Sequence, residues 1–149
     1  MKKNHYPKYE WNADYGFAVC TLLIDGVEIS GSAYCASEDK DFMSEKVGME
    51  LAEKRAIING MKYTVKYNLL PQIKVLKQVL QQIESSKKFN PKNYEYKMIR
   101  RQLKIKESDM AEFKRQIADL EAYIKSYIRV KDDVHKRLRS IRGSKIYKK

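Results

Sequence analysis

The stretch that decides this fold is residues 94–141, which read YEYKMIRRQLKIKESDMAEFKRQIADLEAYIKSYIRVKDDVHKRLRSI. Apolar side chains return every three or four residues, except where Lys106 and Lys131 take two of these positions. The apolar positions are Leu103, Met110, Phe113, Ile117, Leu120, Ile124, Tyr127, Val134, Leu138 and Ile141. No Pro or Gly occurs between Pro91 and Gly143. The spacing predicts one helix, roughly 70 Å long at about 1.5 Å per residue, with a narrow apolar stripe that packs on another helix.

A shorter helical pattern precedes this stretch and offers a partner for it. Pro71 is expected to kink or restart the helix at its beginning. Its apolar positions, again three and four apart, are Ile73, Leu76, Leu80 and Ile83. Residues 85–93 (SSKKFNPKN) then have the composition of a turn between antiparallel helices. We therefore expect a long, coiled-coil-like antiparallel helical hairpin in residues 69–142. Gly143 is expected to end the long helix, which leaves residues 143–149 as a basic tail.

A β-hairpin is the clearest local prediction in the first part of the chain. Asp25-Gly26 lies between two β-rich runs in residues 17–35 and favours a two-residue turn. The predicted register opposes Ile24 and Val27, Leu22 and Ile29, Cys20 and Gly31, and Ala18 and Ala33. That face is apolar or small throughout, so we expect it to be buried. Residues 9–11 are a candidate third strand at an edge.

Residues 44–68 are predicted to form the helix that covers this hairpin. Ser44 is a suitable N-cap. Small residues follow at intervals of four, namely Gly48, Ala52, Ala56 and Gly60. Such a stripe allows a close approach to the small side of the hairpin at Gly31 and Ala33. The expected fold class is α+β, with a small antiparallel β-hairpin head packed on a helix in residues 1–68, followed by the helical hairpin arm.

The charge of the chain is unevenly distributed. Residues 1–50 hold 5 basic and 9 acidic residues, whereas residues 51–149 hold 26 and 10, within a formal net charge of +12. A field of this kind attracts nucleic acid, phosphorylated small molecules or acidic proteins, although a well-solvated helical surface would give the same composition. The predicted partner is therefore an anionic ligand.

Cysteine and acidic residues give no strong sign of a disulfide or a metal site. In the predicted register Cys20 and Cys35 share a face but lie about 13 Å apart, too far for a disulfide. With no secretion signal in the sequence, we expect both to be reduced core residues. The acidic segment in residues 37–41 could bind a cation, but a turn before the helix is the preferred reading.

No catalytic motif stands out in the sequence. His5 and His135, the two histidines, have no Cys or His at metal-ligand spacing. Phosphate-loop, dinucleotide-binding, nucleophile-elbow and zinc-protease patterns are all missing from the sequence. We therefore expect a protein that is not an enzyme and uses neither a cofactor nor a metal.

The candidate ligand-binding residues cluster around the predicted helix–helix turn. Aromatic rings can stack on a base, Asn amides can bond to its edge, and guanidinium groups suit phosphate. The candidates of this kind are Phe89, Asn90, Asn93, Tyr94, Arg100 and Arg101, with Tyr96 nearby. The alternative is that Phe89 closes the turn hydrophobically and the Arg residues are solvated.

The segment GSAYCASEDKDFMSEKVGMELAEKRAIING in residues 31–60 resembles small ββα proteins with a double-stranded-RNA-binding-like fold. The wider layout, with its basic charge and its Arg, aromatic and Asn residues, resembles the phage Thoeris anti-defence 1 family. That family forms oligomeric sponges that sequester cyclic ADP-ribose isomers made by bacterial immune enzymes. The resemblance implies ligand contacts at Arg55 and at the turn around Phe89.

The function expected from these observations is a phage counter-defence protein. It would bind and sequester a nucleotide-derived immune signal, without catalysis, in the cytoplasm of an infected bacterium. A homo-oligomer is expected because a small sheet leaves an open edge, and no membrane partner is expected. Two alternatives remain: a nucleic-acid-binding protein with a basic helical arm, and an adaptor or inhibitor that grips a host defence protein through its coiled coil.

Overall fold

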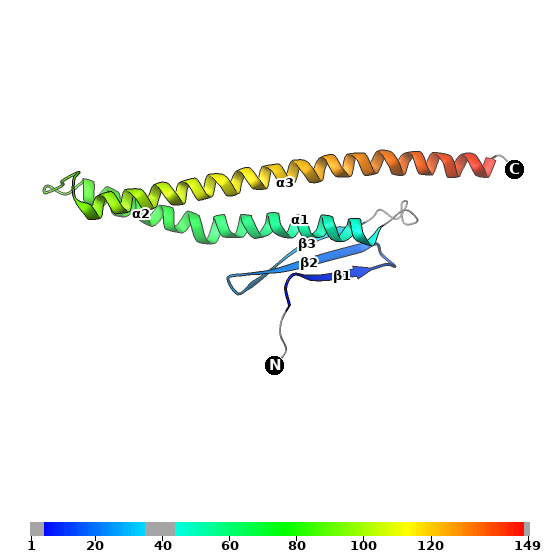
Figure 1. The fold of residues 1–149 in the computed structure, drawn as a ribbon, viewed down its shortest axis with the longest axis horizontal. Helices are drawn as coiled ribbons and strands as arrows, with labels where there is room; N and C mark the ends of the chain where they lie inside the picture. The colour runs from blue at the N-terminus through cyan, green and yellow to red at the C-terminus, as the bar shows by residue number, and fades with distance from the viewer. Residues whose placement is uncertain (1–4, 35–43, 148–149) are drawn as a thin grey trace. The chain divides into compact units, whose positions relative to one another are not determined.

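The computed structural model describes residues 5–34 and 44–147 and has the expected α+β fold (Figure 1). Cys35 and the acidic segment in residues 37–41 lie outside the described residues. The elements are β1 (Lys8–Asn12), β2 (Phe17–Ile24), β3 (Val27–Tyr34), α1 (Glu45–Thr64), the π-helical turn η2 (Val65–Leu69), α2 (Leu70–Glu84) and α3 (Tyr94–Tyr147). No helix in the described part of the chain is both long and apolar enough to cross a membrane.

The chain divides into two compact units that differ from the expected head and arm. Unit 1 is Met1–Gly60 with Asp119–Lys149, and unit 2 is Met61–Ala118. The predicted boundary at residue 68 placed the whole of α3 in the arm. Instead, the last part of α3 belongs to the same unit as the sheet.

The three strands form an antiparallel sheet in the order β1-β2-β3. The predicted hairpin register is confirmed, from Ile24 opposite Val27 at the turn to Ala18 opposite Ala33. Asp25 and Gly26 both have positive φ, 51° and 78°, as a two-residue turn that matches the strand twist requires. The candidate third strand is also confirmed as β1, which pairs with β2 at one edge of the sheet.

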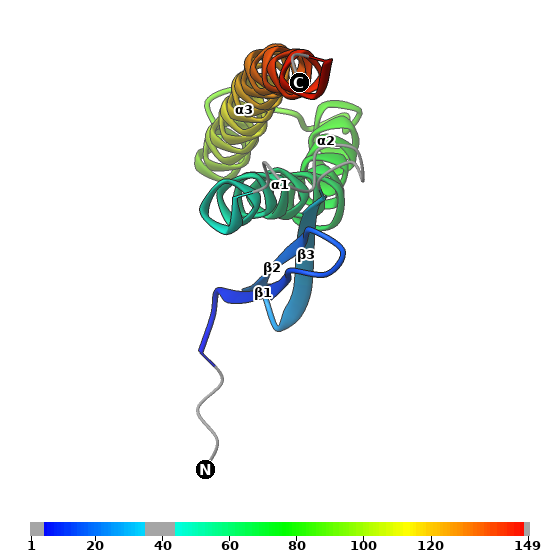
Figure 2. The ribbon, with the colours of Figure 1, turned by 90° about the vertical axis from the view of Figure 1, so that its right-hand side faces the viewer.

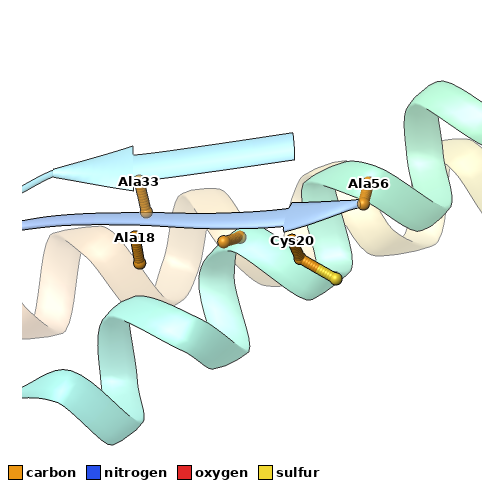
Figure 3. Close-up of a cluster of buried hydrophobic side chains, with 5 residues drawn as sticks. Ala18, Cys20, Ala33 and Ala56 are labelled. Carbon is orange, nitrogen blue, oxygen red and sulfur yellow. The ribbon is translucent and has the colours of Figure 1, made fainter. Parts of the chain in front are cut away.

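The core of unit 1 is made of very small side chains from the sheet and α1. Ala18, Cys20 and Ala33 point from the sheet toward α1, where Ala56 lies close to them (Figure 3). A Cβ atom added at Gly31 would collide with backbone atoms of Ala52 and Ala56. The helix backbone therefore approaches the strand backbone directly, as the small-residue stripe predicted.

The edge of β3 is covered by polar side chains from α1. Because Ile24 and Val27 close a two-residue turn, they are a hydrogen-bonded pair, and bonded and non-bonded pairs alternate from there. The backbone groups of Ser30 and Ser32 must then point outward. Asn59 donates to the Ser30 carbonyl at 2.9 Å, and Arg55 donates to the Ser32 carbonyl at 2.8 Å. One of the two edges of the sheet is therefore capped within the chain.

Helix α1 begins as predicted, with Ser44 as its N-cap. The Ser44 hydroxyl accepts the Val47 N–H at 3.4 Å, and the Ser44 carbonyl accepts the Gly48 N–H at 2.9 Å. The first bond occupies a backbone donor that the first turn of a helix leaves without a partner, and the second is the first backbone bond of the helix itself.

Within unit 1, α1 lies between the sheet and the C-terminal part of α3 (Figure 1 and Figure 2). The ammonium group of Lys54 lies 4.9 Å from the centre of the Tyr123 ring. Burial and, to a lesser degree, the nearby Glu50 carboxylate raise the pKa of Tyr127. Part of the apolar stripe of α3 is therefore partnered by α1 rather than by α2.

A new helix, α2, starts at Leu70, directly before Pro71, with no gap in the helical backbone, because the turn η2 joins it directly to α1. Proline has no N–H to donate to the preceding turn. The chain accommodates it with the wider turn η2, in which the Leu70 N–H donates to the Val65 carbonyl. Helix α2 then continues with Pro71 in its first turn. The expected restart is confirmed, and the π turn lets the helix continue although Pro71 has no N–H to donate.

Helix α3 begins at the predicted turn but ends later than predicted. It runs to Tyr147 through Gly143, so the expected helix end at Gly143 is wrong. Glycine disfavours a helix interior by only about 1 kcal/mol and does not by itself stop a helix. One hydrogen bond across the turn, from Tyr96 to Glu84, joins the end of α2 to the start of α3. A hairpin along the whole of residues 69–142 stays a prediction.

The first prediction concerns the close approach at Gly31. Gly31→Ala places a methyl group against the α1 backbone, and such overpacking should lower the free energy of unfolding by about 3 kcal/mol. Ser32→Ala is the matched control, because the Ser32 side chain is exposed and its change should matter little. Chemical denaturation of both variants measures the difference. Equal stability of the two variants would contradict the proposed backbone contact.

Candidate anion-binding site

The candidate site is a pocket in unit 2 of about 630 Å³ between α2 and the first turns of α3. Its lining combines two leucines, four cationic side chains and one carboxylate. The residues are Leu80, Lys97, Arg100, Arg101, Leu103, Lys104 and Glu107. An apolar wall with several positive charges fits a ligand that has both a flat or apolar part and phosphate groups.

Helical geometry explains why the cations gather at one place. Lys97, Arg100, Arg101 and Lys104 are three, four and seven residues apart, which places them on one face of α3. All four are exposed. Among the side chains that the structure describes, no carboxylate forms an ion pair with any of them. Their charge is therefore available to a ligand.

Arg115 is a contrast on the same helix. Its Nε donates to Glu112 at 3.1 Å, and a second guanidinium nitrogen forms an ion pair with the same carboxylate. These bonds, together with one from Gln116, lower the pKa of Glu112 to about 2. The charge of Arg115 is thus already balanced, unlike that of the pocket cations.

Tyr96 anchors the turn beside the pocket. It is 94% buried, and its hydroxyl donates to Glu84 at 2.8 Å across the turn, which raises the pKa of Tyr96. The Phe89 ring meets it edge-on, with 4.9 Å between centroids. The Arg100 guanidinium lies 5.7 Å from the Tyr96 centroid, within cation–π range. Tyr96 therefore links the turn to a cation of the pocket.

The two candidate Asn side chains shape the turn. The side-chain amide oxygen of Asn93 accepts the N–H groups of Glu95 and Tyr96 and so caps α3. The Asn90 side chain accepts the Lys92 N–H at 3.0 Å. Both bonds are local structural contacts of the kind that Asn makes in turns.

The structure brings together only some of the residues that the sequence suggested. Arg100 and Arg101 line the pocket. Phe89 packs on Tyr96, which agrees with the alternative that Phe89 closes the turn hydrophobically. Tyr94 is 73% exposed and does not line the pocket. Arg55 belongs to the other unit, where it caps β3. A ligand-binding role for Phe89, Asn90, Asn93, Tyr94 and Arg55 stays a prediction.

Sequence reasoning missed part of the pocket. The helix-face spacing of Lys97 and Lys104 with the two arginines was visible in the sequence. Leu80 was seen only as a stripe residue, and nothing in its pattern marked it as a pocket wall. Glu107 had no recognisable signal.

The described residues offer no cluster of metal ligands. Among the described side chains, no group of three or more His, Cys, Asp or Glu is placed to hold a metal ion. The pocket itself contributes the single carboxylate of Glu107 among four cations. Its chemistry therefore favours an anion over a cation.

Comparisons of the chain with protein-family models, with curated proteins and with solved structures each find no match. The functional argument therefore depends on the pocket and on the chemistry of its side chains.

The second prediction tests the structural role of Arg55. Arg55→Met keeps the length of the side chain but removes the donor to Ser32, and should cost about 1 kcal/mol of stability. If the role is structural alone, binding of any ligand should be unchanged once the variant is folded. Thermal unfolding and a binding titration on the same sample measure both. A loss of binding with unchanged stability would instead assign Arg55 to a ligand site.

The third prediction concerns the pH response of Glu112. Its folded pKa of about 2 lies below the ordinary 4.5, so its bond to Arg115 stabilises the fold above pH 4.5 and is lost as the pH falls toward 2. Arg115→Gln should raise the Glu112 pKa toward 4.5, measured by carboxyl NMR titration. Gln116→Ala should cause a smaller shift, and an unchanged titration in Arg115→Gln would contradict the pairing.

Proposed function

We propose that this protein binds a small, phosphate-bearing ligand of the nucleotide class in the pocket of unit 2, and that it acts by holding the ligand rather than transforming it. The supporting observation is the set of four exposed cations on one face of α3, beside two leucines and without ion-pair partners among the described residues. Charges gathered in this way repel one another unless an anion compensates them.

The pocket residues can divide the recognition between them. Arg100 and Arg101 present planar guanidinium groups that suit bidentate contacts to phosphate oxygens. Lys97 and Lys104, one helical turn to either side, act as flexible point charges. The leucine wall can contact the sugar or base of a nucleotide. This arrangement needs no nucleophile or general base.

A binding protein of this kind would function as a sponge. We propose that the ligand is a nucleotide-derived immune signal and that its sequestration serves phage counter-defence in the bacterial cytoplasm. The layout of the chain and its basic charge support this role, since a sponge needs affinity and abundance but no catalytic residues.

A nucleic-acid-binding function is the second candidate. Exposed basic side chains also occur on α3 outside the pocket, including Lys114, Lys125, Arg129 and Lys136. Side chains of this kind can contact the phosphates of a nucleic-acid backbone. Such binding would weaken steeply with added salt, in proportion to the number of phosphates contacted.

The fourth prediction tests the pocket directly. Calorimetric titrations should use cyclic ADP-ribose isomers, cyclic dinucleotides and ADP, with inorganic phosphate as the minimal probe. The double variant Arg100→Gln/Arg101→Gln should weaken nucleotide binding by about a hundredfold, because each charge-assisted contact contributes roughly 1.5–3 kcal/mol. Native mass spectrometry of protein purified from cells that make the signal should show a retained mass of nucleotide size.

The matched control is Lys114→Gln, an exposed cation of the same helix that does not line the pocket. It should leave small-nucleotide binding unchanged. Equal losses in the pocket variant and the control, with tighter binding to duplex or single-stranded probes at low salt, would favour the nucleic-acid function. Absence of heat with every nucleotide and every probe would exclude both.

A further inference from the structure

The two edges of the sheet are not equivalent. The alternation that turns Ser30 and Ser32 outward on β3 also fixes the direction of the backbone groups on β1. On β2, the backbone groups of Cys20 and Ala18 bond to β3. The residues between and beside them bond to β1 instead, in the pairs Thr21 with Lys8, Val19 with Glu10, and Phe17 with Asn12. The N–H and C=O groups of Tyr9 and Trp11, which lie between these, point away from the sheet.

In the part of the chain that the structure describes, no side chain caps this second edge. Asn59 and Arg55 bond to the outward carbonyls of β3. Among residues 5–34 and 44–147, no group bonds to the backbone of Tyr9 or Trp11 on the outer side of β1. Four of the five residues of β1 are exposed. An extended, uncovered strand of this kind is a template for pairing with another strand.

We propose that β1 pairs antiparallel with β1 of a second copy of the chain, about a two-fold axis at Tyr9. In this register the outward groups of the two Tyr9 residues bond reciprocally. Each Trp11 N–H then donates to the Pro7 carbonyl of the second copy. The two three-stranded sheets become one continuous sheet, and the outward backbone groups of β1 gain partners.

Charge complementarity selects the second copy and this register. A two-fold axis at Tyr9 places Lys8 opposite Glu10 of the second copy, and Glu10 opposite its Lys8. These are non-hydrogen-bonded pairs, in which side chains lie closest together. A shift that centres the axis on Glu10 opposes two carboxylates, and one that centres it on Lys8 opposes two ammonium groups. The alternating charges of β1 are therefore complementary to those of β1 in a second copy.

The surroundings of Lys8 are compatible with this pairing. Its ammonium group lies 3.6 Å from Glu28 in the same chain, and both side chains are about half exposed. An exposed pair of this kind is weak, so Lys8 can share its charge with a second carboxylate. Glu10 is exposed and has no ion-pair partner in the described part of the chain. The pairing would supply one.

The test is a charge exchange between two variants, followed by analytical ultracentrifugation of the full chain. Glu10→Lys puts two positive charges on β1, and Lys8→Glu puts two negative charges there. Each variant alone should dimerise at least about tenfold more weakly than the wild type, because both cross-strand pairs become repulsive. An equimolar mixture should recover dimers, because every Lys then faces a Glu in the mixed pair.

Asp14→Lys is the control, since Asp14 is exposed and lies outside β1. It changes the net charge as Glu10→Lys does and should leave dimerisation unchanged. Circular dichroism confirms that each variant is folded. A wild type that stays monomeric at its highest soluble concentration would overturn the proposal. So would a dimer that resists both variants, or a mixture that does not recover dimers.

Discussion

Unit 1 depends on the contact between the backbones of β3 and α1 at Gly31. No side chain separates the two there, because Gly31 meets Ala52 and Ala56 directly. This closeness brings Arg55 and Asn59 within reach of the carbonyls of Ser32 and Ser30. The close approach of β3 and α1 therefore provides both the core packing and the bonds to the edge of β3. A bulkier residue in either element at this contact would weaken both.

The same closeness limits the core. The fully buried positions are Ala18, Cys20, Ala52 and Ala56, so little apolar area is buried per residue between the sheet and α1. Larger side chains such as Trp11, Leu22, Met49 and Leu51 pack around this centre. On its other side α1 has aromatic partners from α3, including Tyr123. A helix with neighbours on both sides explains why α1 has no single apolar stripe.

Unit 2 positions charge in a different way. Its turn is held by hydrogen bonds from Asn90 and Asn93 and by the buried Tyr96, whose hydroxyl bonds to Glu84. These contacts orient the first turns of α3, where the cations of the pocket lie. The positive field of residues 51–149 thus has a defined surface on which a ligand could bind. Residues 1–50 are net acidic, which suits β1 better to its own copy than to a polyanion.

Local patterns in the sequence were enough to predict the β-hairpin with its register, the third strand, the Ser44 cap, the restart at Pro71 and the helix–helix turn. Each depends on neighbours in the chain, such as two residues with positive φ or a missing N–H. The candidate site was only partly predictable: the spacing of the cations on α3 was visible, whereas the leucine wall and the bond between Tyr96 and Glu84 join residues from different elements. Tertiary structure alone decided that the end of α3 belongs with the sheet and that Arg55 caps β3. The physical reason is that an apolar stripe specifies that a helix must pack but not which partner it packs against, and an Arg side chain specifies a charge but not which oxygen it meets.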